Sequence, residues 1–121
     1  MAKGVKKATG CLGEGIAAAW LPAKGFEILE RNWRSGRYEI DIVASRQGKL
    51  HFIEVKTRRN DRYGLPEAQV GLRKLRNMVE AGTRYLDVHR GWKRVSYDIL
   101  AIRLQRDGPT ELLLIEDVYL P

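Results

Sequence analysis

Residues 39–41 and 54–56, Glu-Ile-Asp and Glu-Val-Lys, each alternate charged with apolar side chains. Side chains two residues apart on a β-strand point to the same face, so Glu54 and Lys56 share a face if their stretch is extended. The short polar segment between the two stretches contains a glycine and predicts a hairpin, with a connection longer than the tightest kind. Such a hairpin brings Asp41 close to Glu54 and Lys56, where a divalent metal and a water nucleophile could bind.

Three acidic residues, Glu14, Asp41 and Glu54, lie in otherwise apolar stretches. A buried carboxylate is costly unless a cation or hydrogen bonds compensate it, so each residue is expected to have a partner. Alternatives stay open at this point. Glu14 could instead lie in the first turn of a helix, where the dipole favours it, and Asp41 could form a structural salt bridge with Lys56 or an arginine.

If the three carboxylates cluster, they raise one another's pKa unless a cation neutralises them. Magnesium, or manganese in its place, suits such a site because it prefers oxygen ligands and retains several waters. The metal would lower the pKa of a bound water and stabilise the charge that develops on a phosphate. Lys56 could orient that water or neutralise the transition state.

The formal charge of +7 favours a polyanionic partner such as nucleic acid or an anionic membrane surface, although charge alone does not exclude an enzyme whose basic surface has no such partner. Basic residues follow the second strand and recur in the next expected helix, where they would suit phosphate contacts or could form a solvated rim. These residues are Arg58, Arg59, Arg62, Arg73 and Lys74. His51 and His89 match no metal-ligand spacing, and His51 alternates to the face opposite Glu54, which favours a structural role.

The 121 residues suffice for one domain, which we expect to be α/β with a mixed sheet of about five strands flanked by helices. Residues 1–9 are expected to form a flexible basic arm and residues 10–121 the domain. Helices are expected over 11–23 and 67–88, and strands over 26–33, 38–44, 50–57, 95–104 and 111–119. The single cysteine excludes an internal disulfide and favours the cytoplasm, and no stretch reaches the length of a membrane span.

The chain resembles the YraN-like family of the PD-(D/E)XK nuclease superfamily, which is similar to archaeal Holliday-junction resolvases. The resemblance runs from about Gly13 to the end. It is carried by Gly-Glu at 13–14, Arg-Asn-Trp-Arg at 31–34, Glu-Ile-Asp-Ile-Val-Ala at 39–44, Phe-Ile-Glu-Val-Lys-Thr-Arg at 52–58 and Pro-Glu-Ala at 66–68 with Lys74. The family usually has glycine before the Glu-Ile-Asp triplet, where this chain has Tyr38.

The resemblance implies a restriction-endonuclease-like fold and an active site formed by Glu14, Asp41, Glu54 and Lys56, with the carbonyl of Val55 as a further metal ligand. The function expected is a magnesium-dependent deoxyribonuclease, acting on branched or otherwise structured DNA. A four-way junction would suit a two-fold homodimer. Two other interpretations remain open: a nucleic-acid-binding module that retains the nuclease fold without turnover, and a basic scaffold whose acids form structural ion pairs.

Overall fold

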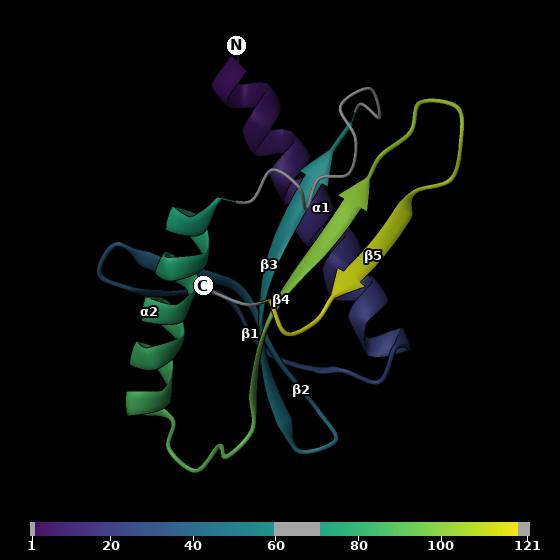
Figure 1. Ribbon diagram of the computed structural model, residues 1–121. Helices are drawn as coiled ribbons and strands as arrows, with labels where there is room; N and C mark the ends of the chain where they lie inside the picture. Colours follow the sequence, from purple (N-terminus) through teal and green to yellow (C-terminus); the bar gives the residue numbers. More distant parts are fainter. Residues whose placement is uncertain (1, 60–70, 119–121) are drawn as a thin grey trace.

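The computed structural model describes residues 2–59 and 71–118, with side chains from Gly10 onward. Within those ranges a five-stranded sheet is accompanied by two helices (Figure 1). The elements in chain order are α1 (Ala2–Ala23), β1 (Glu27–Ser35), β2 (Tyr38–Arg46), β3 (Lys49–Arg58), α2 (Leu72–Val88), β4 (Val95–Arg103) and β5 (Glu111–Ile115).

The strands lie in the sheet in their chain order, β1-β2-β3-β4-β5. Neighbouring strands are antiparallel except β3 and β4, which are parallel because the chain returns through α2 before β4 begins. The predicted α/β domain with a mixed sheet of about five strands is therefore confirmed. The open sheet with its two helices is consistent with a restriction-endonuclease-like fold.

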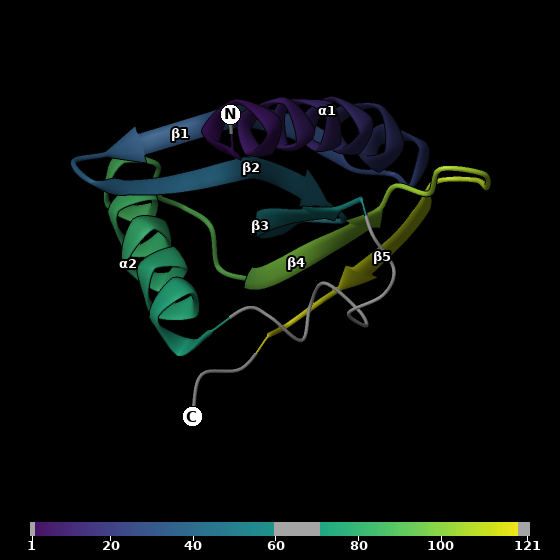
Figure 2. The ribbon, with the colours of Figure 1, turned by 90° about the horizontal axis from the view of Figure 1, so that it is seen from above.

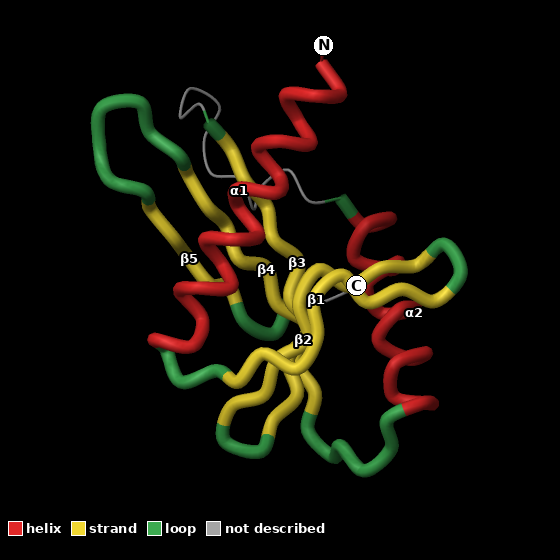
Figure 3. Tube along the Cα trace, turned by 180° about the vertical axis from the view of Figure 1, so that it is seen from behind, coloured by secondary structure: helices red, strands yellow, loops and turns green. Residues whose placement is uncertain are grey.

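The two helices cover opposite faces of the sheet, as the view from above shows (Figure 2). The helix α1 crosses one face, where Ala17 and Leu21 pack in a buried cluster with sheet residues that include Ile53 (Figure 3). On the other face, Ala81 and Tyr85 of α2 pack in a second cluster. The sheet residues of that second cluster are Ile40, Val43, Leu50 and Phe52. The sheet is thus buried on both sides, which explains its long apolar runs.

The connection between β2 and β3 is shorter than the sequence predicted. Both strands extend further, to Arg46 and from Lys49, so that two residues, Gln47 and Gly48, make the turn. Their φ values are 52° and 76°, and two consecutive residues with positive φ are typical of the tight turn whose twist matches that of the flanking strands. Gly48 adopts a positive φ without strain, whereas a glutamine at position 47 does not predict a positive φ from the sequence.

Strands β1 to β4 differ from the expected ranges by one or two residues at some of their ends, and α1, α2 and β5 differ as follows. The helix α1 begins at Ala2, within the segment expected to be a basic arm, and ends at Ala23 just after Pro22, as predicted. The flexibility of that arm stays a prediction. The helix α2 begins at Leu72, and the expected helical residues 67–70 lie outside the described residues. The strand β5 ends at Ile115, and residue 119 of its expected range also lies outside them.

Candidate active site

Asp41 and Glu54 lie opposite each other where β2 and β3 separate. The antiparallel ladder pairs Ile42 with Ile53 as its last pair on this side, so the next residues in that register are Asp41 and Glu54. Beyond that pair, the backbone N–H of Val55 donates to Oδ2 of Asp41 at 2.8 Å. The side chain of Asp41 thereby satisfies a strand N–H that would otherwise need a backbone carbonyl. The two carboxylates that the sequence singled out are brought together.

The proximity of the two carboxylates is unfavourable when both are ionised. Burial, followed by the charge of Glu54, raises the pKa of Asp41 to about 7, although the hydrogen bond from Val55 opposes the shift. A side-chain hydrogen bond with Glu54 adds to the rise, because it needs a proton between the two groups. Below about pH 7 the pair therefore shares a proton, at a place that a divalent cation could take.

Two lysines lie beside the acids. Nζ of Lys74 on α2 lies 3.2 Å from Oε1 of Glu54, whose residue is 7 % exposed. Partial burial lowers the pKa of Lys74, but the charges of Glu54 and then Asp41 outweigh it and raise the pKa overall. Partial burial and nearby Arg58 lower the pKa of Lys56, with Glu54 opposing. The structure thus places Lys56 near the acids and pairs Glu54 with Lys74 across the face covered by α2.

Glu14 reaches the same region from α1. Burial, followed by the charge of Asp41, raises the pKa of Glu14, while a side-chain hydrogen bond with Asn32 lowers it. The interpretation of Glu14 as a first-turn residue is wrong, because α1 begins at Ala2 and its first turn contains no acid. The carboxylate instead lies half-buried near Asp41, so the helix dipole does not explain it.

A glycine allows α1 to approach β3 beside Glu14. A Cβ added to Gly13 would overlap Oγ1 of Thr57 and lie 3.0 Å from its Cβ. At Gly15, on the exposed side of α1, an added Cβ would have no neighbour within 4 Å. Gly13 is therefore required by the close packing that brings Glu14 over the end of β3, and Gly15 is not.

We expect Gly13→Ala to destabilise the protein by about 1–3 kcal/mol, because the methyl group overpacks the contact with Thr57. Gly15→Ala should instead stabilise it by up to about 1 kcal/mol, because alanine favours the helix and meets open space. Urea unfolding of both variants measures the difference. Thr57→Ala should recover part of the loss in the Gly13→Ala background. Equal stabilities for the two glycine variants would contradict the close approach of α1.

The predicted nucleic-acid-binding residues surround this region unevenly. Arg58 ends β3 and is half-buried, Arg59 is exposed directly after it, and Arg73 is exposed on the first turn of α2. Lys74 forms an ion pair with Glu54, so it lies among the residues of the candidate active site. Arg62 lies outside the described residues. Contact of these residues with nucleic acid stays a prediction.

A second polar group lies buried on the face covered by α1, where the sequence suggested a purely structural histidine. Nδ1 of His51 lies 2.6 Å from Oδ2 of Asp98, and Oγ of Ser96 donates to Oδ1 of Asp98 at 2.5 Å. The backbone N–H of Asp117 also donates to Oδ1 of Asp98, at 3.2 Å. Asp98 is completely buried and His51 is 1 % exposed. A carboxylate buried in this way needs several donors, and it has them.

His51, Asp98 and Glu116 could hold a metal ion, since their ligand atoms all lie within 4.8 Å of one another. Among the described residues, Glu14, Asp41 and Glu54 do not form a group gathered this tightly. A metal here would compete with Arg46, because Nη2 of Arg46 lies 3.0 Å from Oε1 of Glu116. Sequence reasoning missed Asp98 and Glu116. Asp98 carried the signal used for Asp41, an isolated acid in an apolar strand.

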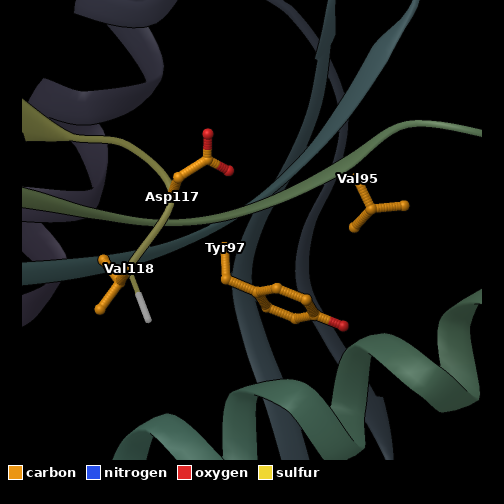
Figure 4. A pocket seen from close by; sticks show the side chains of 4 residues that line it. All are labelled: Val95, Tyr97, Asp117 and Val118. Carbon is orange, nitrogen blue, oxygen red and sulfur yellow. The ribbon is translucent and has the colours of Figure 1, made fainter. Parts of the chain in front are cut away.

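A hollow of about 250 Å³ lies where the chain leaves β5 and passes β4 (Figure 4). It is lined by Val95, Tyr97, Asp117 and Val118. The ring of Tyr97 points toward α2, whereas the carboxylate of Asp117 points away from that ring (Figure 4). The polar groups do not converge in this hollow, so it is a weaker candidate for chemistry than the acids at β2 and β3.

Neither helix of the described residues is long and apolar enough to cross a membrane.

Comparison with known proteins places the chain in a family. The model of the family described as "Uncharacterised protein family UPF0102" matches residues 13–102. A UPF0102 protein of Syntrophomonas wolfei is 39% identical over 104 residues, covering 85% of this chain and 90% of the relative. One of Rhodococcus jostii is 37% identical over 113 residues, covering 93% and 96%, and one of Chlorobaculum parvum is 44% identical over 94 residues, covering 77% and 73%. The chain belongs to the UPF0102 family, the YraN family that its sequence resembled, which has a PD-(D/E)XK-like nuclease fold.

Proposed function

We propose that this protein is a metal-dependent endonuclease that hydrolyses phosphodiester bonds in DNA. The observation that carries the proposal is the pair of adjacent carboxylates, Asp41 and Glu54, with Lys56 two residues further along β3. A pair that raises the pKa of one member to about 7 is expected where a cation belongs. Structural ion pairs also shift pKa values, so the cation must be tested directly.

The donor set fits magnesium or manganese. Asp41 and Glu54 supply carboxylate oxygens, and the hydrogen bond from Val55 places its peptide beside Asp41. Glu14 lies close enough for the charge of Asp41 to raise its pKa. These are oxygen donors, as hard divalent cations prefer, and no thiolate or imidazole is among them. When bound, the metal would activate a water and stabilise charge on the scissile phosphate.

The side chains around the acids have separate roles in this proposal. Asp41 and Glu54 hold the cation, and Glu14 accepts hydrogen bonds from water at the edge of the cation site. Lys56, whose pKa is lowered by partial burial and by Arg58, donates a hydrogen bond to the attacking water or to the phosphate and so positions the group that it contacts. The charge of +7 favours a polyanion over a neutral substrate. We further propose that it acts in the cytoplasm, and as a two-fold dimer if its substrate is a four-way junction.

One contact favours a second function, a nucleic-acid-binding module without turnover. Lys74 already neutralises Glu54 at 3.2 Å, so the acids have a cation of their own. For the endonuclease to work, Lys74 must share Glu54 with the metal or move to the phosphate. A basic scaffold with structural ion pairs would use the same contact and bind neither metal nor DNA.

We expect the protein to cleave at least one DNA in a panel of linear, flapped and four-way substrates with magnesium or manganese. Glu54→Gln should abolish cleavage while DNA binding remains, because the change removes one charge from the acidic pair. Denaturing gels of DNA labelled at the end of either strand measure cleavage of both strands, and native gels of the same DNA measure binding.

The matched control is Glu111→Gln on β5, which makes the same chemical change at a residue paired with Arg103. It should leave cleavage unchanged. DNA binding without cleavage of any substrate would favour the binding module. Cleavage that survives Glu54→Gln would rule out the proposed site.

A further inference from the structure

A polar pocket of about 290 Å³ lies between the start of α2 and the turn that joins β1 to β2. It is lined by Arg37 and Tyr38 from the turn side and by Arg73 and Asn77 from the helix. Its volume is just below the usual range for drug-sized ligands, so it suits a small group such as a phosphate. All four lining side chains carry a hydrogen-bonding group, and three of these can donate without rotating a hydroxyl.

The pocket collects positive charge at a place where a helix already disfavours it. Arg73 lies on the first turn of α2, which contains no acid and whose N-cap, Gly71, provides no side-chain hydrogen bond. The N-terminus of a helix carries partial positive charge, so a cation there is unfavourable unless an anion compensates it. Arg37 adds a second guanidinium to the same pocket. The charges and the hollow together indicate an anionic ligand.

Tyr38 holds Arg37 in position. The Nη2 atom of Arg37 donates to the hydroxyl of Tyr38 at 3.0 Å, and its guanidinium carbon lies 5.0 Å from the centre of the same ring. Arg84 of α2 also contacts that ring, at 4.7 Å, and its Nη1 reaches Oγ of Ser35 at 3.5 Å. These contacts join α2 to the turn between β1 and β2, so the two walls of the pocket are linked before a ligand binds.

The pocket adjoins the acidic pair through two short stretches of chain. Tyr38 begins β2, three residues before Asp41, and Arg73 precedes Lys74, which contacts Glu54. We propose that this pocket binds a backbone phosphate of a DNA strand, next to the phosphate that Asp41 and Glu54 would act upon. The proposal rests on the proposed function for its choice of DNA. Arginine suits the role because its planar fork matches two phosphate oxygens.

The test is DNA binding measured in chelator, so that its result does not depend on metal or on turnover. Fluorescence anisotropy of a labelled duplex, and of one of its strands alone, gives affinity as a function of salt. Arg37→Ala and Arg73→Ala should each make the slope of log affinity against log salt less steep by about 0.9 on the duplex. The matched control, Arg90→Ala, removes an exposed arginine beyond the far end of α2 and should keep the parent slope.

Competition with inorganic phosphate tests whether the pocket binds a phosphate of DNA or free phosphate. At equal ionic strength it should compete with DNA better than chloride does, and this excess should disappear in the Arg37→Ala/Arg73→Ala double variant. Slopes equal to those of the parent would overturn the proposal. If the excess depends on these arginines while the DNA slope does not, the pocket binds free phosphate and the DNA subsite is wrong. Cleavage in magnesium is scored separately, so an inactive protein with arginine-dependent binding refutes only the endonuclease.

Discussion

In chelator, the Asp41→Asn variant is expected to unfold at the same temperature as the parent or at a higher one. The folded parent places Asp41 beside Glu54, and burial together with the charge of Glu54 raises the pKa of Asp41 to about 7. Asparagine removes the charge but retains an oxygen that can accept the hydrogen bond from Val55. The variant therefore loses a repulsion and keeps the contact that fixes the side chain.

The raised pKa of Asp41 also predicts how the difference in stability between Asp41→Asn and the parent changes with pH. Because the pKa of Asp41 is raised on folding, the folded protein binds more protons than the unfolded chain between about pH 4 and pH 7. The free energy of unfolding of the parent should thus decrease across that window as pH rises. The difference between Asp41→Asn and the parent should grow in favour of the variant up to about pH 7 and then level off. Thermal melts in chelator at pH 4, 5, 6, 7 and 8 follow it.

With magnesium or manganese, the parent should become more stable than Asp41→Asn. A ligand that binds only the folded state at 100 times its Kd stabilises it by about 2.7 kcal/mol, and Asp41→Asn should lose that gain. Glu116→Gln is the control, because Glu116 belongs to the other group that could hold a metal. It should keep the full metal effect if the cation binds at Asp41.

The opposite result has a clear meaning. If Asp41 is half of a buried ion pair, Asp41→Asn leaves a charge without its partner and should cost about 3–5 kcal/mol in chelator. Such a loss, with no metal effect on the parent, would mean that the acids are structural. The endonuclease proposal would then be abandoned.

Much of the candidate site could be predicted because its signals are local. The period of two along a strand placed Glu54 and Lys56 on one face, and the hairpin supplied the partner strand for Asp41. The isolation of Glu14 in an apolar helix allowed either a first-turn carboxylate or one with a partner, and the structure places it half-buried near Asp41. Each inference needed only neighbouring residues, and a sheet buried on both faces leaves few other places for such acids.

The features that sequence reasoning missed depend on contacts between distant segments. The pairing of Lys74 with Glu54 requires the crossover helix to dock at a particular height on the sheet. The group around Asp98 requires the parallel register of β3 and β4, which pairs His51 with Ser96 and Ile53 with Asp98. Neither register nor docking height follows from periodicity alone. The tight turn at Gln47 was missed for a different reason, since a non-glycine residue with positive φ carries no compositional signal.

Asp98→Ala is expected to have the largest effect on stability, about 3–5 kcal/mol. Asp98 is completely buried and accepts hydrogen bonds from Ser96 and from the backbone of Asp117, with His51 at 2.6 Å. Removing the carboxylate takes from buried His51 its partner and from Ser96 one of its two acceptors, and it opens a cavity beside these side chains. Urea unfolding at pH 7 measures the loss, with Asp107→Ala, an exposed aspartate in the β4–β5 connection, as the control.

A smaller change at the same place tests whether the hydrogen bonds are the cause. Ser96→Ala removes one donor to Asp98 and leaves the others, so it should cost about 1 kcal/mol, well below the loss for Asp98→Ala. The metal alternative predicts a different pattern. If zinc stabilised the parent and Asp98→Ala abolished that gain, His51, Asp98 and Glu116 would be ligands of a second metal centre. A loss below about 1 kcal/mol for Asp98→Ala, with no zinc effect on the parent, would contradict both interpretations, because a fully buried carboxylate with three donors cannot be removed at so little cost.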